Sequence, residues 1–134
     1  MLSQRRRLLA GSYCVFFTRY SVATYLSSFF PQYTAQLGIS VLVDGLIFAA
    51  YPLGMTLTSV AATAIVPALG SRTCCYVGLS ATSIFTAAFG CASLIASSSS
   101  AQAAIFFGSY FLSGLVGALS ETACLILVSV EFKD

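Results

Sequence analysis

The sequence contains no histidine, tryptophan or asparagine, and only 7% of its 134 residues are charged. In a soluble domain about a quarter of all residues are charged and cover the surface, so this composition points to a lipid environment. Six Lys and Arg against four Asp and Glu is too small an excess to indicate nucleic-acid binding. The sequence therefore predicts an integral membrane protein, with the lipid bilayer as its main partner and no nucleic-acid partner.

The same absences argue against catalysis and metal binding. Without histidine, cysteines would have to supply the soft metal ligands alone, and none of them forms a C-x-x-C pair. The five are scattered along the chain: Cys14, Cys74, Cys75, Cys91 and Cys124. The sequence also has no glycine-rich phosphate loop and no nucleophile with a base at a usable spacing. We therefore expect the protein not to be an enzyme, and to hold neither a metal nor a cofactor.

Apolar residues, 58% of the chain, gather in stretches long enough to cross a bilayer, for which about 20 residues are needed. The predicted fold is all-α, a polytopic membrane protein with four transmembrane helices. Their expected bounds are about residues 8–30, 42–69, 73–95 and 103–130.

Local signals mark where these helices begin and end. Pro31 is expected to stop the first helix, because proline lacks the backbone N–H that a helix interior uses. Ser40 can cap the second helix, and Asp44 suits the positive end of its dipole. The serine run at 97–100 is expected to separate the third helix from the fourth.

The basic residues indicate the orientation, because short loops rich in Lys and Arg stay in the cytoplasm. The loops at 31–41 and 96–102 contain neither residue type. Every basic residue outside the predicted spans lies at the opposite end: Arg5, Arg6, Arg7, Arg72 and Lys133. This pattern predicts a multi-pass protein with both termini in the cytoplasm.

The N-terminus has a second interpretation. "RRRLLAGSYCVFF" followed by "YSVA" resembles a signal peptide, with small residues at Ser21 and Ala23. Against this, apolar residues resume at once in "TYLSSFF", and the whole segment has the length of a span. Cleavage would leave the other three helices in the same orientation.

Two ionisable residues lie well inside the predicted spans. Arg19 is about 16 Å above the cytoplasmic end of the first helix, and Glu121 is about 13 Å above the same surface on the fourth. A lipid-facing arginine at this depth costs several kcal/mol, so Arg19 is expected to face protein, water or a partner. The similar depths make Glu121 its most plausible partner.

Small residues share the helix face of Glu121. Tyr110, Gly114 and Gly117 lie on one stripe with Glu121 and Val128, and small residues allow another backbone to approach. The face of the first helix that meets protein stays open, because the stripe of Arg19 is mostly apolar and the opposite face carries hydroxyls. The pair itself has two interpretations: an ion pair that orients two helices, or part of a substrate or proton path.

The stretch "TAIVPALGSR" resembles the loop between helices two and three of the major facilitator superfamily, which reads G-x-x-x-D-R-x-G-R-R. Gly70 and Arg72 match its second Gly and final Arg. The other motif positions differ here, where they are occupied by Thr63, Pro67, Ala68 and Ser71.

The flanking segments are also similar to this superfamily. "LGISVLVDGLIFAAYPLG" looks like the entry to its helix two, with Gly45, Tyr51 and Gly54 at expected places. The segment from Ser109 onward resembles helix four of the drug and vesicular-amine antiporter branches. It matches their pattern at Gly114, Ala118, Thr122 and Ala123, whereas Tyr110 replaces an Arg associated with proton coupling and Val116 replaces a Gly.

The resemblance implies transport of a small organic solute, and it leaves proton coupling open because Tyr110 replaces the Arg associated with it. Transporters of this class have six-helix halves built from inverted three-helix repeats, so helices one and four are equivalents that line the cavity. Arg19 and Glu121 would then face the substrate path. Pro52 and Gly54 would allow helix two to bend.

Four helices cannot enclose a path that opens to two sides in turn. We therefore expect residues 1–134 to be the N-terminal part of such a transporter, completed by its remaining helices or by another chain. Two alternatives stay open. A four-helix scaffold or assembling subunit would tolerate neutral residues in place of Arg19 and Glu121. A small dimeric multidrug exporter would fit the length, but usually carries a carboxylate in helix one.

Overall fold

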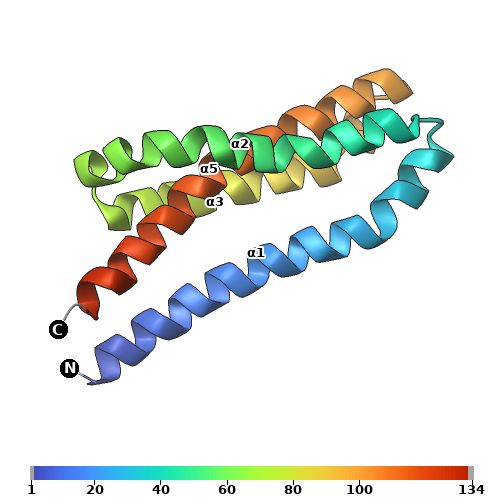
Figure 1. The fold of residues 1–134 in the computed structure, drawn as a ribbon. Coiled ribbons are helices and arrows are strands. Elements are labelled where there is room, and N and C mark those ends of the chain that lie inside the picture. Colours follow the sequence, from blue (N-terminus) through green and yellow to red (C-terminus); the bar gives the residue numbers. More distant parts are fainter. Residues whose placement is uncertain (1, 133–134) are drawn as a thin grey trace.

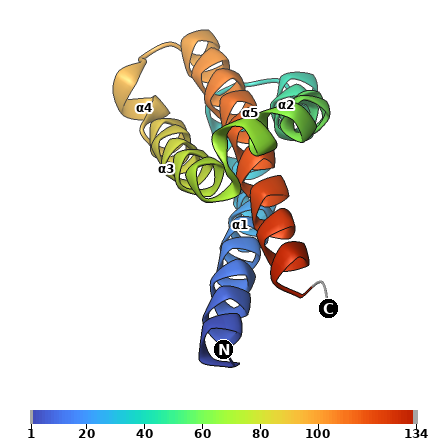
Figure 2. The ribbon, with the colours of Figure 1, turned by 90° about the vertical axis from the view of Figure 1, so that its left-hand side faces the viewer.

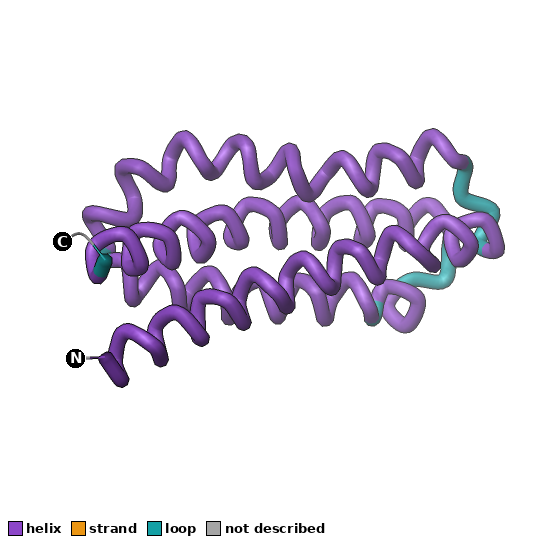
Figure 3. Tube along the Cα trace, turned by 60° about the horizontal axis from the view of Figure 1, so that its bottom comes forward, coloured by secondary structure: helices purple, strands orange, loops and turns teal. Residues whose placement is uncertain are grey.

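The computed structural model describes residues 2–132, and among these all side chains except those of residues 2–4, 22, 23 and 25. The described chain is helical and contains no strand, which confirms the all-α prediction. Its elements are α1 (Leu2–Gln36), α2 (Val41–Leu69), α3 (Ser71–Gly90), the single-turn α4 (Ala92–Ile95) and α5 (Ser99–Glu131). Short connections join the helices (Figure 3).

Three helices are long and apolar enough to cross a membrane: α2, α3 and α5. These indicate an integral membrane protein with several spans. Helix α1, which contains the predicted first span, is not among the three. Its sequence carries Arg19 and many Ser, Thr and Tyr residues, which lower its mean hydropathy.

The long helices run in alternating directions. Figure 1 shows that the start of α1, the end of α5 and the α2–α3 connection all lie at one end of the bundle. Arg5, Arg6, Arg7 and Arg72 therefore share that end, as the charge pattern predicts. Lys133, the fifth basic residue of the pattern, lies outside the described residues.

Helix α5 lies between α2 and α3 (Figure 2) and packs closely against both. Glycines allow this approach. A Cβ on Gly114 would overlap the backbone of Tyr51 in α2, and one on Gly78 of α3 would lie 2.8 Å from Cβ of Ser120. A Cβ on Gly54 would likewise collide with the α5 backbone. Gly114, on the predicted stripe, and Gly54 thus bring α2 against α5, and Gly78, outside that prediction, does the same for α3.

Helix α1 has fewer close neighbours and is attached near its C-terminal end by aromatic rings. Phe30 is 1% exposed, and its ring centroid lies 5.6 Å from Phe48 of α2, 5.1 Å from Phe89 of α3 and 5.1 Å from Phe106 of α5. We call these four rings the aromatic cluster. It joins all four long helices at the end of the bundle opposite the basic residues.

The prediction that Pro31 ends the first helix is wrong, since α1 continues to Gln36. A proline inside a helix removes one backbone hydrogen bond, and the helix can absorb the loss by bending. Figure 1 shows α1 changing direction near its C-terminal end. Thr34 stabilises this last turn, because its hydroxyl donates to the carbonyl of Phe30 and lies 3.1 Å from a carboxylate oxygen of Asp44.

The start of α2 agrees with the sequence. Ser40 is its N-cap, and its hydroxyl oxygen accepts a hydrogen bond from the backbone N–H of Val43 at 3.4 Å. Asp44 lies in the first turn, where a negative charge favours the helix dipole.

The bounds of the third and fourth predicted helices need correction. The predicted span 73–95 is divided, because α3 ends at Gly90 and a separate turn, α4, follows Cys91. Only part of the serine run at 97–100 lies between the helices, and the rest belongs to the start of α5. Ser98 caps α5 by accepting from the N–H of Ala101 at 3.4 Å, and the helix begins at Ser99. Ser side chains at a helix start satisfy backbone donors, which makes them better caps than spacers.

Candidate functional site

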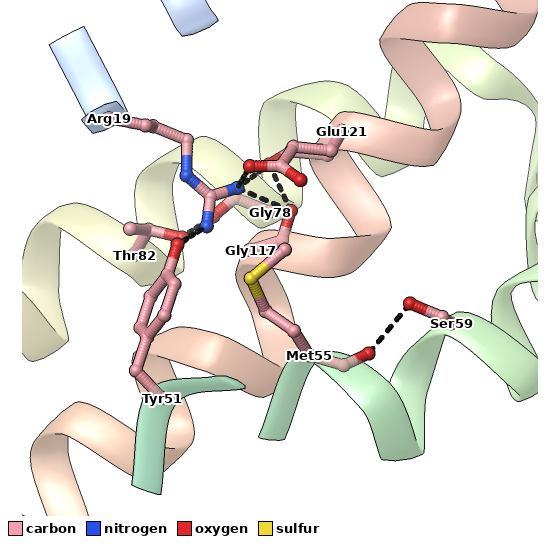
Figure 4. Close-up of polar contacts among 9 residues, drawn as sticks. Arg19, Tyr51, Met55, Ser59, Gly78, Thr82, Gly117 and Glu121 are labelled. Carbon is pink, nitrogen blue, oxygen red and sulfur yellow. Dashed lines mark hydrogen bonds and ion pairs between the residues drawn. The ribbon is translucent and has the colours of Figure 1, made fainter. Parts of the chain in front are cut away.

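Arg19 reaches from the middle of α1 to α5 (Figure 4). Its Nη1 lies 3.2 Å from Oε1 of Glu121, and the two side chains are only 8% and 14% exposed. The two ionisable residues that the sequence places at similar depth are therefore in contact. The contact also settles the open question about α1, because the face that carries Arg19 meets protein.

Three further groups accept hydrogen bonds from this guanidinium. Nη1 donates to the backbone carbonyl of Gly117 at 2.5 Å and lies 3.3 Å from the hydroxyl of Ser120. Nη2 donates to the hydroxyl of Tyr51, and the Arg19 Cζ lies 5.6 Å from the centre of that ring. We call Arg19, Tyr51, Gly117, Ser120 and Glu121 the arginine cluster. It connects α1, α2 and α5 at mid-length.

The spacing along α5 explains why these acceptors converge. Gly117, Ser120 and Glu121 are three and four residues apart, so they share one face of the helix. Gly117 has a specific role there, since a Cβ at this position would come within 2.7 Å of Arg19 Cζ. Its lack of a side chain gives the guanidinium access to the α5 backbone.

Two tyrosines and a phenylalanine continue the arginine cluster toward the aromatic cluster. The rings of Tyr51 and Tyr110 are 5.0 Å apart, and those of Tyr110 and Phe89 are 5.5 Å apart. Tyr110 stands where the antiporter pattern that this sequence resembles has an Arg. Here it presents a ring to its neighbours and carries no charge.

A cavity of about 670 Å³ lies beside these rings, bounded by α1, α2, α3 and α5. Its wall is mainly apolar and aromatic, with scattered hydroxyls. It extends from Cys14 and Val15 on α1, past Arg19, to Leu26. The facing residues come from the other three helices, among them Tyr51, Thr82, Phe85, Phe89, Ser113 and Tyr110. Among the described residues of this wall, Arg19 is the only one with a formal charge.

The remaining predicted residues lie elsewhere. Gly70 connects α2 to α3 with φ of +85°, a conformation that glycine adopts without strain, and Arg72 is exposed in the first turn of α3. Both lie at the end of the bundle and outside the cavity. Pro52 is inside α2, which continues through it as one helix, and Gly54 packs against α5. A hinge at these two residues stays a prediction.

Sequence reasoning missed Tyr51 and Ser120 as partners of Arg19. The chain has seven tyrosines, and nothing in their pattern separates Tyr51 from the others as a hydrogen-bond acceptor. Ser120 could have been predicted as a partner of Arg19, because it precedes Glu121 and lies three residues after Gly117 on the same helix face. The contact between Gly78 and Ser120 was also missed.

The site combines an ion pair with several hydrogen-bonding groups. Arg19 and Glu121 together carry no net charge, and the pair is surrounded by hydrogen-bonding groups, as a buried pair requires. No group of three or more His, Cys, Asp or Glu within the described residues could hold a metal ion. The arrangement can hold a small molecule against an apolar wall and orient it through one charged group and several hydroxyls.

Comparison with known protein families, curated proteins and solved structures found no match to this chain. The site must therefore be interpreted from its own residues. The class that these residues define is a helical, multi-pass membrane protein with a charged cluster and a cavity between its helices.

Proposed function

We propose that the chain forms the first four helices of a facilitator-type secondary transporter, and that the arginine cluster lies on its solute path. The observation that carries this proposal is the ion pair between Arg19 and Glu121, with Arg19 also in the cavity wall. A charged residue buried at this depth is costly in a membrane, and such residues commonly mark substrate or ion pathways.

The helix arrangement supports the proposal. In inverted-repeat transporters the first helix of each three-helix repeat lines the central cavity. Helices α1 and α5 would be those equivalents, and they are the two that supply Arg19 and Glu121. In this arrangement α4 is a connection, and α5 opens the second repeat.

The proposal makes α1 the fourth span, although its composition alone does not mark it as one. The arginine of α1 is held by Glu121, Gly117, Ser120 and Tyr51, so its cost in lipid is reduced. The repeat would also place two further helices against α1, as α2 and α3 pack against α5. Those helices would come from the rest of the transporter or from another chain.

Solute counterflow in proteoliposomes tests this function. The protein expressed from its complete transcript is reconstituted, the vesicles are loaded with unlabelled benzoate or tetraphenylphosphonium, and uptake of the labelled compound is measured. We expect saturable counterflow of at least one probe, lost in Arg19→Gln and kept in Arg7→Gln. Arg7 is an exposed arginine of the same helix and serves as the matched control.

Two results would contradict transport. One is folded protein without counterflow of either probe. The other is equal activity of Arg19→Gln and Arg7→Gln, which would leave Arg19 without a role in the path. Either result favours the four-helix scaffold or assembling subunit, in which neutral residues are tolerated at Arg19 and Glu121.

A further inference from the structure

The described residues of the cavity wall carry one sign of formal charge. Arg19 contributes to the wall, whereas Glu121 does not. The carboxylate of Glu121 meets the guanidinium from α5, on a different side from Tyr51 (Figure 4). A molecule entering the cavity therefore meets the cationic group of the pair without meeting the anionic one.

Arg19 also keeps donor capacity. A guanidinium has five N–H donors. The bonds that Arg19 makes to described residues all come from Nη1 and Nη2, and none of them uses Nε. A carboxylate in the cavity can therefore bind to this side chain while part of the existing cluster stays in place, since arginine is suited to bidentate recognition of carboxylates.

The rest of the cavity wall indicates what kind of ligand body would fit beside Arg19. Among the described residues that line the cavity, four carry aromatic rings: Tyr51, Phe85, Phe89 and Tyr110. Hydroxyls of Thr82 and Ser113 are interspersed with them. Such a wall favours a flat apolar body, because ring contacts add offset-stacked and edge-to-face interactions to the burial of apolar surface.

We propose that this cavity binds a small aromatic monocarboxylate, with Arg19 as its charge partner. This inference rests on the proposed function for its biological meaning, and it names the substrate class of that same site. It differs from the organic cations that the antiporter resemblance suggests. The difference follows from the part of the wall that the structure describes, where a cation would find aromatic faces but no carboxylate and would meet the charge of Arg19.

Glu121 then competes with the ligand for Arg19. Removing its charge frees the guanidinium and leaves a single cation beside the cavity. Glu121→Gln is therefore expected to strengthen binding of a carboxylate, and Arg19→Gln to weaken it. A cationic ligand would respond with the opposite signs. A pair that only orients the helices would weaken binding in both variants.

The test is binding of three matched compounds to the protein expressed from its complete transcript and purified in lipid nanodiscs: 2-naphthoate, 2-naphthamide and 2-naphthylmethylamine. They share one body and carry charges of −1, 0 and +1. Naphthalene fluorescence reports the binding, and residues 1–134 add no indole background because they contain no tryptophan. A charge-assisted hydrogen bond is worth about tenfold or more in affinity.

We expect naphthoate to bind about tenfold more tightly than the other two compounds. We also expect this advantage to disappear in Arg19→Gln, to increase in Glu121→Gln and to stay unchanged in Arg7→Gln. Thermal unfolding of each variant checks that it is folded. If Glu121→Gln does not fold, the three compounds on the unaltered chain still decide the charge class.

Preference for the amine, or weaker naphthoate binding in both Gln variants, overturns the inference. Absence of binding by all three compounds overturns it as well. Competition adds a check on the source of the carboxylate. Benzoate should displace naphthoate, and displacement by decanoate alone would mean that the site takes membrane fatty acids, against the aromatic class proposed.

These outcomes are separate from the fate of the transport proposal. Counterflow of tetraphenylphosphonium together with amine binding would keep transport and reject the carboxylate class. Naphthoate binding with no counterflow of any probe would keep the binding site and reject transport.

Discussion

Within the described residues, two arginine–glutamate pairs connect α1 and α5, in different surroundings. Nε of Arg5 lies 3.7 Å from Oε1 of Glu131 at the end of the two helices, and both side chains are 38% exposed. Arg19 and Glu121 lie 3.2 Å apart at mid-length, with exposures of 8% and 14%. The two pairs therefore consist of the same residue types, but one is in contact with solvent and the other is buried.

The comparison shows how burial changes the consequence of losing one partner. An exposed pair competes with water and ions, so either residue can be replaced at little cost. A buried pair is different, because removal of one member leaves a charge that neither water nor protein compensates. The arginine cluster surrounds Arg19 with a carbonyl and two hydroxyls, whereas Arg5 has the ring of Phe132 at 5.4 Å. Helix α1 is thus fixed at mid-length by polar contacts and near its C-terminal end by aromatic ones.

The largest effect is expected from Arg19→Leu. This change leaves the carboxylate of Glu121 buried without its partner and should lower the free energy of unfolding by about 3–5 kcal/mol. Denaturation by SDS in bicelles measures it. Arg7→Leu, in an exposed position of the same helix, is the control and should change stability by no more than about 0.5 kcal/mol. Similar losses in both variants would contradict the buried character of the pair.

Tyr51→Phe removes one acceptor from the arginine cluster and keeps every charge. Hydrogen bonds to charged groups contribute about 1.5–3 kcal/mol, so a loss of that size is expected in the same assay. Tyr76→Phe is the matched control, because Tyr76 is 75% exposed on α3. Equal stability of the two variants would show that Arg19 does not depend on the Tyr51 hydroxyl.

Gly117→Ala tests access of the guanidinium to α5. The added methyl group would displace Arg19, and overpacking of this kind costs about 1–3 kcal/mol. Alanine also favours the helix by up to about 1 kcal/mol, so a net loss of about 1 kcal/mol is expected. In Gly108→Ala, on the same helix, a Cβ has no neighbour within 4 Å, and this control should be neutral or slightly stabilising. Stabilisation by Gly117→Ala would be inconsistent with the close approach.

The smallest effect is expected at the exposed pair. Arg5→Gln should lower the free energy of unfolding by less than about 1 kcal/mol. Added salt should diminish even this difference, because exposed charges are screened. The check is the SDS assay repeated at low and high salt. A loss as large as that of Arg19→Leu would remove the distinction between the two pairs.

The all-helical fold, the alternating directions of the long helices and the Arg19–Glu121 contact could be predicted from the sequence, whereas the four predicted spans compare with three helices that are long and apolar enough to cross a membrane. Long apolar stretches and the segregation of basic residues are strong signals in a membrane protein. The pair was predictable because few ionisable residues lie inside the spans, and two of them have similar depth. The roles of Ser40 and Asp44 at the start of α2 could also be predicted, since capping depends on residues close in sequence.

Other features depend on contacts between distant residues and left no local signal. Pro31 was expected to end α1, but the helix bends and is held by Thr34 and the aromatic cluster. The break at Cys91 and the cap at Ser98 could not be predicted, because several neighbouring serines, alanines and glycines have similar preferences for helix ends. Tyr51 could not be assigned to Arg19 because helix periodicity does not reveal which neighbouring helix a side chain meets.

The most direct test is a double-mutant cycle on Arg19→Leu and Glu121→Leu, with unfolding free energies measured by SDS titration in bicelles. Residues that pair directly show interaction energies of about 0.5–3 kcal/mol, and separate ones add within about 0.5 kcal/mol. The arginine cluster predicts a coupling near the upper end of that range, with the double variant much more stable than the sum of the single losses implies. Additive losses would mean that Arg19 and Glu121 do not pair, and the connection between α1 and α5 described above would be contradicted.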